Sequence, residues 1–539
     1  MKRLLILFFC SIVACCVAPM AVLAQQQQKN EAAEQYQKLS RFYRFLSGMY
    51  VDEVEMKPLV DKAIREMLSE LDPHSYYLDA DAVKADRESM GGSFSGIGIE
   101  FNVQRDTIVV VNTLLRGPAE SVGVMPNDRI VEVDSVSVVG LKREEVPAKL
   151  RGEKGSVVNI GIVRRGHPEM LRFSITRDNI PINTVDAAFW VDSDKKIAYI
   201  KVNRFGATTM SEFREAMAKM EGAESLILDL CGNGGGLLTQ AVEMAGYFLP
   251  KGSLVVSTEG RAVPEEQYIS QNEQEFDGRV VVLLNGTSAS ASEVVAGALQ
   301  DWDRGVVVGR DSFGKGLVQR QIPLGDGSAV RITVARYHTP SGRVLQRPYE
   351  NGHKSDYYEA HANRLRGQGA DSLSADTIAK PEYKTLISSR KVYGGGGICP
   401  DFYVESDTTE ISDYAVQIIS QGVYSDFIMS YLDANREKLK SQYPAFEKFN
   451  EQFRLSDADM EALVAAATAK GVEYNAEEYA ISKEYLRDQL TSVIAQRLYS
   501  ISDGYRWLNP RRNLYYKRAV SLLDNWSKEV EPLFKPKEE

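Results

Sequence analysis

The sequence predicts a multidomain α/β protein with helical N- and C-terminal regions. A chain of 539 residues is several times longer than a typical domain of about 150 residues. Short apolar runs alternate with helix-like periods in the middle of the chain, and the last third carries apolar residues mainly at helical spacing. We expect the segments 1–24, 25–90, 91–178, 179–403 and 404–539 to be separate parts.

The composition is that of an ordinary soluble globular protein, with 44% hydrophobic and 26% charged residues. The net charge is −10 and the isoelectric point is about 5.4. An acidic chain of this kind does not suggest a nucleic-acid partner.

The first 24 residues have the pattern of an export signal. Lys2 and Arg3 precede a long apolar run, and Val22-Leu23-Ala24 offers small residues for cleavage. This pattern predicts a signal peptide and a periplasmic protein. A retained membrane anchor and a lipoprotein signal, in which Ile12–Cys15 resembles a lipobox, remain open alternatives that would leave the protein associated with the membrane.

The cysteines do not form a disulfide framework. Three of the five lie inside the predicted signal, which leaves Cys231 and Cys399 in the mature chain.

Residues 25–90 read as helical. Apolar residues between Leu59 and Leu71 recur at intervals of three and four, and Asp72-Pro73 ends this helix. His74 follows in the motif LDPHS. No acid and serine stand around it in the pattern of a catalytic histidine, so we interpret it as a structural turn residue.

Residues 91–178 resemble a PDZ domain. Gly96-Ile97-Gly98-Ile99 opens the segment, and GPAESVGVMPNDRIVEVD follows downstream. In PDZ domains such a glycine loop donates backbone N–H groups to the C-terminal carboxylate of a peptide, which adds as a strand beside it. The resemblance therefore implies a partner with a free C-terminus, bound at Gly96, Ile97, Gly98 and Ile99.

A serine stands at a strand-to-helix junction in the middle of the chain. Val280–Leu284 reads as a buried strand, and helical spacing begins at Ser292 after a turn of small residues. Ser290 thus faces unpaired backbone N–H groups at a helix N-terminus, which suits a nucleophile whose reaction develops negative charge. A helix-capping role is the alternative for this serine taken alone.

A lysine follows 25 residues after this serine. A short strand, Val306–Val308, and a glycine-containing loop lead to Lys315, so the strand–helix–strand unit could bring Lys315 to Ser290. Lysine acts as a base only when burial lowers its pKa from about 10.4 to about 7–8. Asp311 is the nearest carboxylate in sequence. Gln319 lies about 13 Å further along a straight strand, so it can orient Lys315 only if this segment bends.

Together the motifs SASASE and FGKGLVQ resemble those of the carboxyl-terminal processing peptidases of family S41, the tail-specific serine proteases with a Ser–Lys dyad. The resemblance extends from about Tyr50 to Asp401. It implies that Ser290 is the nucleophile, Lys315 the base and Gln319 its support. It also implies a crotonase/ClpP-like mixed α/β protease core.

A glycine loop, Cys231–Gly236, follows another predicted strand and precedes a helix. It lacks the GK[ST] ending of a nucleotide-binding loop. The family resemblance implies an oxyanion hole instead, with one N–H from Gly235 or Gly236 and the other from Ala291. The family more often has arginine where Cys231 stands.

Two later segments are interpreted as structural. Residues 345–385 are polar and rich in tyrosine, which indicates a surface insertion, and Tyr393–Asp401 matches a glycine-rich motif of the family. For the helical segment 404–539, homodimerisation and substrate handling both remain open.

The combined prediction is an exported serine endopeptidase that needs no metal or organic cofactor. Its substrates would be proteins or peptides with free C-termini. Two alternatives are a non-catalytic PDZ adaptor on an inactive protease fold and a His–Asp–Ser PDZ protease. The second is disfavoured because the chain has only five histidines and no GNSGG motif.

Overall fold

The computed structural model describes residues 30–104, 106–114, 116–366, 380–405 and 409–535. The chain divides into two compact units, the first ending at Leu71 and the second beginning at Asp72. The described part of the first unit contains a helix over residues 30–49 and α2 (Met56–Ser69), of which the apolar spacing between Leu59 and Leu71 predicted the second. The signal predicted over residues 1–24 lies outside the described residues.

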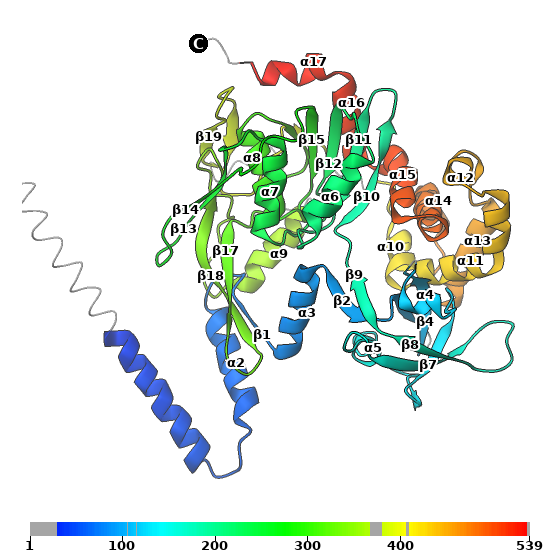
Figure 1. The fold of residues 1–539 in the computed structure, drawn as a ribbon, viewed down its shortest axis with the longest axis horizontal. Coiled ribbons are helices and arrows are strands. Elements are labelled where there is room, and N and C mark those ends of the chain that lie inside the picture. The colour runs from blue at the N-terminus through cyan, green and yellow to red at the C-terminus, as the bar shows by residue number, and fades with distance from the viewer. Residues whose placement is uncertain (1–29, 105, 115, 367–379, 406–408, 536–539) are drawn as a thin grey trace, which may run out of the picture. The chain divides into compact units, whose positions relative to one another are not determined.

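The centre of the second unit is a mostly parallel sheet (Figure 1). Its described strands follow the order β10-β11-β12-β15-β16-β21, and only β10 runs antiparallel to its neighbour. These strands are β10 (Val185–Asp192), β11 (Ile197–Val202), β12 (Ser225–Asp229), β15 (Arg279–Leu284), β16 (Val306–Gly309) and β21 (Phe402–Tyr403).

Alternate residues of these strands point to two different helical layers. Ile200, Leu228 and Val282 belong to a core cluster with α6 (Thr209–Ala218), α7 (Leu238–Phe248) and α8 (Ala291–Asp301). Tyr199, Ile227 and Leu283 belong to another cluster, which includes residues of α16 (Leu514–Asp524). Both faces of the parallel sheet are therefore covered, as buried parallel strands require. One of the two covering layers comes from the end of the described chain.

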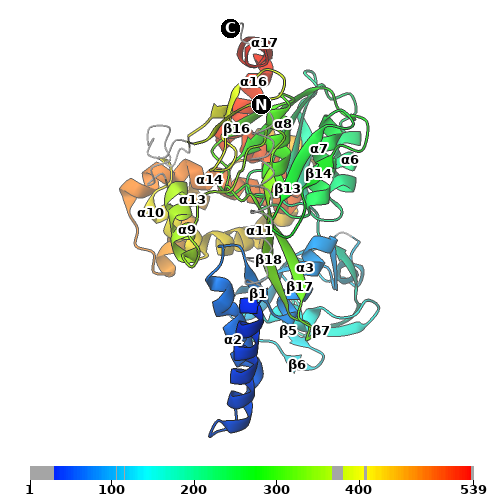
Figure 2. The ribbon, with the colours of Figure 1, turned by 90° about the vertical axis from the view of Figure 1, so that its left-hand side faces the viewer.

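A second sheet carries the segment after Lys315. Strand β17 (Leu317–Pro323) pairs with β18 (Ala329–His338), and Figure 2 shows the two as a long hairpin. The other strands of this sheet are β1 (Tyr76–Leu78), β13 (Leu254–Glu259) and β14 (Glu266–Ile269).

The predicted PDZ segment has its own sheet and core cluster. Its described strands follow the order β3-β4-β5-β7-β8, with β6 paired to β5, so β3 lies at an edge. The strands are β3 (Ile99–Gln104), β4 (Thr107–Thr113), β5 (Arg129–Val133), β6 (Val136–Ser137), β7 (Val157–Val163) and β8 (Leu171–Thr176). The helices are α4 (Pro118–Ser121) and α5 (Val146–Leu150). Before this segment come α3 (Ala80–Gly91) and β2 (Ser93–Gly96), and β2 pairs with β9 (Asp178–Pro181).

The C-terminal part is helical, as predicted. Helices α10 to α15 enclose an aromatic-rich core cluster of their own that includes Phe427, Phe449 and Trp507. These helices are α10 (Asp413–Ser420), α11 (Val423–Gln442), α12 (Phe446–Gln452), α13 (Asp457–Ala469), α14 (Ala476–Leu498) and α15 (Ile501–Arg512). After α16 come α17 (Trp526–Glu529) and a 3-10 turn, Glu531–Leu533.

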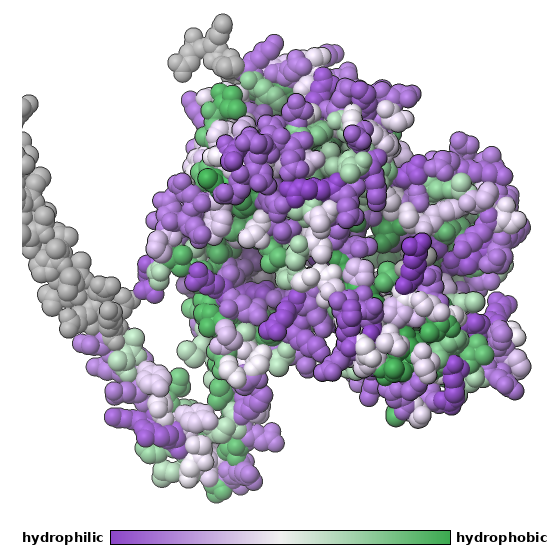
Figure 3. All heavy atoms as spheres, in the orientation of Figure 1, coloured by the Kyte–Doolittle hydropathy of each residue, from purple (hydrophilic) through white to green (hydrophobic). Residues whose placement is uncertain are grey.

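On the face of residues 72–535 shown in Figure 3, hydrophilic side chains cover most of the surface, and apolar ones appear in small separate groups. Within the described residues, no helix is long and apolar enough to cross a membrane.

Candidate active site

Ser290 is the N-cap of α8, at the junction where the sequence placed it. Its backbone has φ 55° and ψ −113°, a left-handed conformation that is rare for a residue with a side chain. Such backbone strain costs about 1–3 kcal/mol and is concentrated at functional sites. The turn holds Ser290 beside the Ala291 N–H, which has no acceptor among the described residues, whereas the N–H groups of Ser292 and Glu293 donate to the carbonyls of Ala289 and Ser290.

A single buried carboxylate joins the serine turn to the lysine loop. Glu293, fully buried in α8, accepts hydrogen bonds through Oε2 from the Ser290 N–H at 2.7 Å and the Lys315 N–H at 2.9 Å. Its Oε1 accepts from the Gly314 N–H at 2.8 Å and from the Ser312 hydroxyl. The backbone nitrogens of Ser290 and Lys315 therefore lie within two hydrogen-bond lengths of each other. The sequence displayed Glu293 in SASASE but did not reveal this role.

Lys315 is half-buried and has the electrostatic setting of a base. Burial lowers its pKa first, and the charge of Arg331 lowers it further, against the raising effects of Glu293 and Asp72. It forms no ion pair within the described chain. Asp311, the nearest carboxylate in sequence, pairs with Lys380 instead at 2.9 Å. The Ser290 hydroxyl and the Lys315 amine make no direct hydrogen bond among the described residues, which is common before substrate binds.

Tyr337 in β18 adjoins both reactive loops. Its N–H donates to the carbonyl of Gly316 at 2.8 Å, and its hydroxyl interacts with the Ser290 side chain. Burial raises the pKa of Tyr337 to about 12, so it stays a neutral hydroxyl at physiological pH. No sequence motif pointed to Tyr337, because it stands 47 residues after Ser290 in an otherwise ordinary strand.

The segment after Lys315 bends, as a supporting role for Gln319 requires. A register shift between Val318 and Gln319 interrupts the β17–β18 pairing. The Gln319 side chain then donates to the hydroxyl of Thr333 at 3.4 Å, and Thr333 donates to Asp72 at 2.9 Å. Gln319 thus joins the polar surroundings of Lys315 without contacting it directly in this structure.

His74 lies beside the lysine loop. Its ring packs edge-on against Tyr357 with centroids 5.4 Å apart, and it is only 5% exposed. Burial, and then the charge of Lys315, lower its pKa to about 4, so His74 is neutral at physiological pH. The turn predicted for this residue is present, since Asp72 accepts the His74 N–H at 2.9 Å. Its position next to the predicted base was not visible in the sequence.

The described helix of the surface insertion predicted over residues 345–385, α9 (Lys354–Leu365), has one exposed face and one buried face. Tyr357, His361 and Arg364 of this helix are each less than 9% exposed. Arg364 donates to the carbonyl of Ser312 at 2.7 Å, and the His361 ring packs at a tilt against Phe313 with centroids 4.3 Å apart. Alternating polar and aromatic residues suggested a surface, but α9 uses them to brace the lysine loop. In the same region are β19 (Glu382–Lys384) and β20 (Lys391–Tyr393).

The glycine loop lies against the serine turn. A Cβ on Gly235 would come 2.8 Å from the Cβ of Ser290, and one on Gly236 would come 2.1 Å from the carbonyl oxygen of Phe205. Both glycines have positive φ, so no other residue fits easily. The Gly235 N–H already donates to Asn233 at 2.9 Å. Among described residues the N–H groups of Gly236 and Ala291 have no acceptor, so they are the freer pair of predicted oxyanion donors.

Cys231, where the family more often has arginine, sits over a buried ion pair. Its N–H donates to Asp229 at 2.8 Å, and its carbonyl accepts from Lys201, which pairs with Asp229 at 3.0 Å. The start of the glycine loop is therefore held through its backbone. Within the described residues, no cluster of three or more His, Cys, Asp and Glu side chains could hold a metal ion.

Two carbonyls of the predicted peptide-binding loop, Gly96 to Ile99, accept hydrogen bonds that fix the loop in place. Ala119 donates to the carbonyl of Ile97 at 2.9 Å, and Leu114 donates to that of Gly98 at 2.8 Å. The N–H groups of Ile97 and Gly98 have no backbone acceptor in the described chain. Two donors are therefore available at the start of the edge strand β3.

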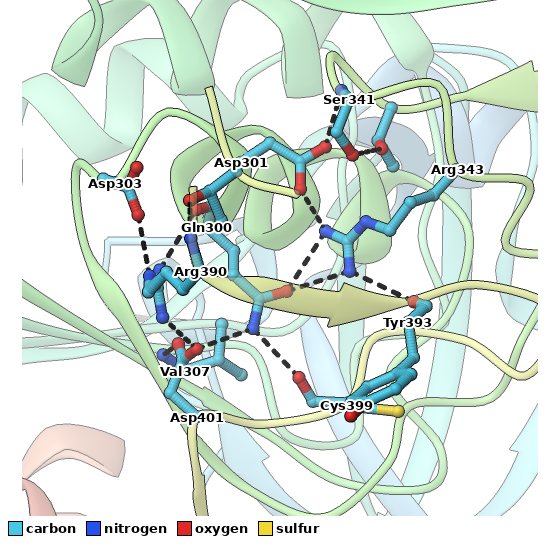
Figure 4. A network of polar contacts seen from close by, with 12 residues as sticks. Gln300, Asp301, Asp303, Val307, Ser341, Arg343, Arg390, Tyr393, Cys399 and Asp401 are labelled. Atoms are coloured by element: carbon cyan, nitrogen blue, oxygen red, sulfur yellow. Dashed lines mark hydrogen bonds and ion pairs between the residues drawn. The ribbon is translucent and has the colours of Figure 1, made fainter. Parts of the chain in front are cut away.

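The opposite end of α8 anchors the core through a polar network (Figure 4). The Asp301–Arg343 ion pair is fully buried, and Arg343 also donates to Gln300 at 3.1 Å. Gln300 donates to the carbonyl of Cys399 at 2.9 Å and to Asp401 at 3.0 Å, while Arg390 pairs with both Asp303 and Asp401. The structural reading of the motif Tyr393–Asp401 agrees with this placement.

Family models match four parts of the chain. Peptidase family S41 matches residues 196–358, and a PDZ domain matches residues 95–175. A model described as the N-terminal domain of the activating protease CtpB matches residues 16–82, and a family of unknown function matches residues 414–500.

Two relatives with known names point the same way. A carboxy-terminal processing protease, CtpB, from Bacillus subtilis is 34% identical over 353 residues, which cover 64% of this chain and 74% of the relative. A carboxy-terminal-processing protease from Bartonella bacilliformis is 36% identical over 348 residues, covering 61% and 77%. A solved structure titled photosystem II D1 C-terminal processing protease is 28% identical, with a TM-score of 0.36 and coverage of 68% and 86%. The chain belongs to the carboxy-terminal processing proteases of peptidase family S41 and is a serine-type endopeptidase with a PDZ domain.

Proposed function

We propose that this protein is an exported endopeptidase that captures the C-terminal tail of a protein substrate with its PDZ domain and cleaves by a Ser290–Lys315 dyad. The observation that carries the dyad is Glu293, whose Oε2 accepts the N–H groups of both residues. Support for export is the signal pattern of residues 1–24, and the periplasm is the proposed compartment.

The proposed chemistry proceeds through an acyl-enzyme. Neutral Lys315 takes the proton from the Ser290 hydroxyl as the oxygen attacks the peptide carbonyl carbon. The oxyanion is stabilised by the N–H groups of Gly236 and Ala291. The lysine then gives its proton to the departing amine. Water attacks the ester, Lys315 accepts the water proton, and Ser290 recovers a proton as the new carboxyl end leaves.

The pH profile follows from the lowered pKa of Lys315. Because only the neutral amine accepts a proton, kcat/KM is expected to rise with pH through the pKa of Lys315 and to level off above it. A profile that falls over the range in which Lys315 loses its proton contradicts its role as the base.

The cleavage test uses a partly unfolded protein substrate with either a free apolar C-terminus or an amidated, charged one. Mass spectrometry follows its products with wild type, Ser290→Ala and Lys315→Ala. The matched control is Lys391→Ala, which removes an exposed lysine paired with Glu382. We expect cleavage by wild type and the control, mainly of the free-ended substrate, and a loss of about 10²–10⁴-fold for Lys315→Ala. Undiminished cleavage by Lys315→Ala overturns the dyad, and equal cleavage of both substrates overturns tail capture.

Two further measurements test the remaining parts. Acid quenching of the reaction is expected to trap a peptide fragment esterified to Ser290, detectable by mass. Sequencing the N-terminus of protein purified from the periplasm is expected to begin at Gln25. Recovery of the full-length N-terminus from the cytosol contradicts export.

A further inference from the structure

The strand β3 offers an open edge beside the predicted peptide-binding loop. Among the described strands it pairs only with β4, and it begins one residue after Gly98. A captured tail would add along this edge as a further strand. Side chains of a strand point alternately to the two faces, so the tail residues opposite Glu100 and Asn102 share their face.

That face of β3 lies against the C-terminal helices. Ile99, Phe101 and Val103 pack on the core of the PDZ domain, which leaves Glu100, Asn102 and Gln104 on the outer face. Gln104 donates to Asp426 of α11 at 2.6 Å, and Glu100 pairs with Arg497 of α14 at 2.5 Å. The tail's outward side chains would therefore meet a second domain instead of water.

A pocket of about 310 Å³ lies at this junction. Its volume falls at the lower end of the range for ligand pockets, about 300–1,000 Å³. Glu100, Asn102 and Val111 line it from the PDZ domain, and apolar residues including Met429, Leu432 and Val493 line it from the helices. Arg143 and Arg436 also line it, and neither forms an ion pair with a carboxylate among described residues.

We infer that the helical domain spanning α10 to α15 completes the tail-binding site, so that the outward side chains of a captured tail are read jointly by β3 and α11. The inference rests on the proposed capture of tails by the PDZ domain. The favoured occupant is a C-terminal segment with a bulky apolar residue at an outward position. Lysine or arginine at that position is disfavoured, because the pocket already holds the charges of Arg143 and Arg436.

Binding is measured with full-length protein carrying Ser290→Ala, so that peptides stay intact. Fluorescent ten-residue peptides with a free carboxylate carry leucine, alanine or lysine at each of the last four positions in turn. Fluorescence anisotropy gives each Kd. We expect leucine to strengthen binding at alternate positions on the outward face, and lysine there to weaken it.

Met429→Trp fills the pocket from α11. Met429 is half-buried and is not part of the helical core cluster, so the helix tolerates the change. Loss of a buried leucine side chain corresponds to tenfold or more in Kd. Met429→Trp is therefore expected to weaken the outward-leucine peptides at least tenfold and the alanine peptides less than twofold. Met429→Ala gives a milder loss in the same peptides. Ser430→Trp, at the exposed neighbouring position outside the pocket, is the matched control.

The two proposals fail in different ways. Gly98→Val disrupts the PDZ loop, since Gly98 has φ 74° and a Cβ there would crowd Ile180. If wild-type binding is lost with Gly98→Val but Met429→Trp and Ser430→Trp behave alike, the joint site is wrong and tail capture stands. If free and amidated peptides bind equally, or no peptide binds, tail capture itself is overturned.

Discussion

The two ends of helix α8 bury carboxylates in opposite ways. At the C-terminal end, Asp301 pairs with the buried guanidinium of Arg343. At the N-terminal end, Glu293 is equally buried but accepts only N–H and O–H groups, and burial raises its pKa. A fixed cation neutralises the structural end. The N–H and O–H donors around Glu293 hold the serine turn and the lysine loop together, and none of them adds a positive charge beside Lys315.

The largest expected effect comes from breaking the Asp301–Arg343 ion pair at the C-terminal end of α8. Arg343→Met leaves Asp301 buried without its cation, so we expect a loss of about 3–5 kcal/mol in the free energy of unfolding. Urea unfolding followed by tryptophan fluorescence measures it. The control Lys391→Met removes an exposed pair with Glu382, so its free energy of unfolding is expected to stay close to that of wild type.

The double variant Asp301→Leu/Arg343→Met sharpens this test. Replacing both charges with apolar groups of similar volume is expected to recover most of the lost stability. A double variant as unstable as Arg343→Met alone shows that the wider network, not the unpaired charge, dominates.

The stability of the region around Lys315, which includes His74, is expected to fall in acid. The folded-state pKa of His74 is about 4 against about 6.5 when unfolded, so the unfolded chain binds the proton first. The contribution of neutral His74 to the free energy of unfolding is complete above pH 6.5, and on the order of 3 kcal/mol of it is lost as the pH falls towards 4. His74→Phe is expected to reduce this loss in unfolding curves taken between pH 7 and 4. An unchanged slope contradicts the buried neutral state. His361, whose pKa is also about 4, accounts for a similar share.

Glu293→Gln tests whether the Glu293 carboxylate holds the serine turn and the lysine loop together. An amide keeps the shape but replaces one acceptor oxygen with an NH₂ group that faces N–H donors, which costs about 1–3 kcal/mol. The lysine loop is then no longer held against Ser290, so kcat is expected to fall more than substrate affinity. Full activity in Glu293→Gln would show that the two loops hold their positions without this carboxylate.

The smallest expected effect is a gain. Lys315→Met removes a half-buried amine that has no ion pair among described residues, so we expect an inactive enzyme that is more stable by about 0.5–2 kcal/mol. The pKa of Lys315 is lowered by folding, so the unfolded chain holds its proton to higher pH. The gain is therefore greatest near neutral pH and shrinks as pH approaches 10. Thermal unfolding at pH 7 and pH 10 measures the difference.

Local signals were sufficient to predict the strand–turn–helix around Ser290 and the lysine loop, whereas the bend before Gln319 was only a condition for its supporting role. Each depends on residues close together in the chain. The remaining partners of the site could not be predicted, because they arrive from distant segments. Asp72 reaches the site through Thr333, 261 positions later, and α9 braces the loop with side chains that resemble a polar surface.

The same limit explains α16. Nothing in the sequence showed that Ala519 and Leu522 would pack on strands of the protease sheet. The predicted boundary at residue 403 separates segments by sequence pattern. The packing instead joins α16 to the protease core.

The cover that α16 gives the central sheet also sets an order of events during synthesis. The strands that carry Tyr199 and Leu283 leave the ribosome more than two hundred residues before Leu522. One apolar face of the sheet therefore stays uncovered until α16 has been synthesised. Contacts between such distant segments form slowly, and exposed apolar strands favour aggregation meanwhile. Chains stopped before α16 are expected to be captured by chaperones or degraded, which pulse-labelling of truncated chains measures. Proteolytic competence would then arise only when the last helices are in place, which delays the appearance of an active protease inside the cell that makes it.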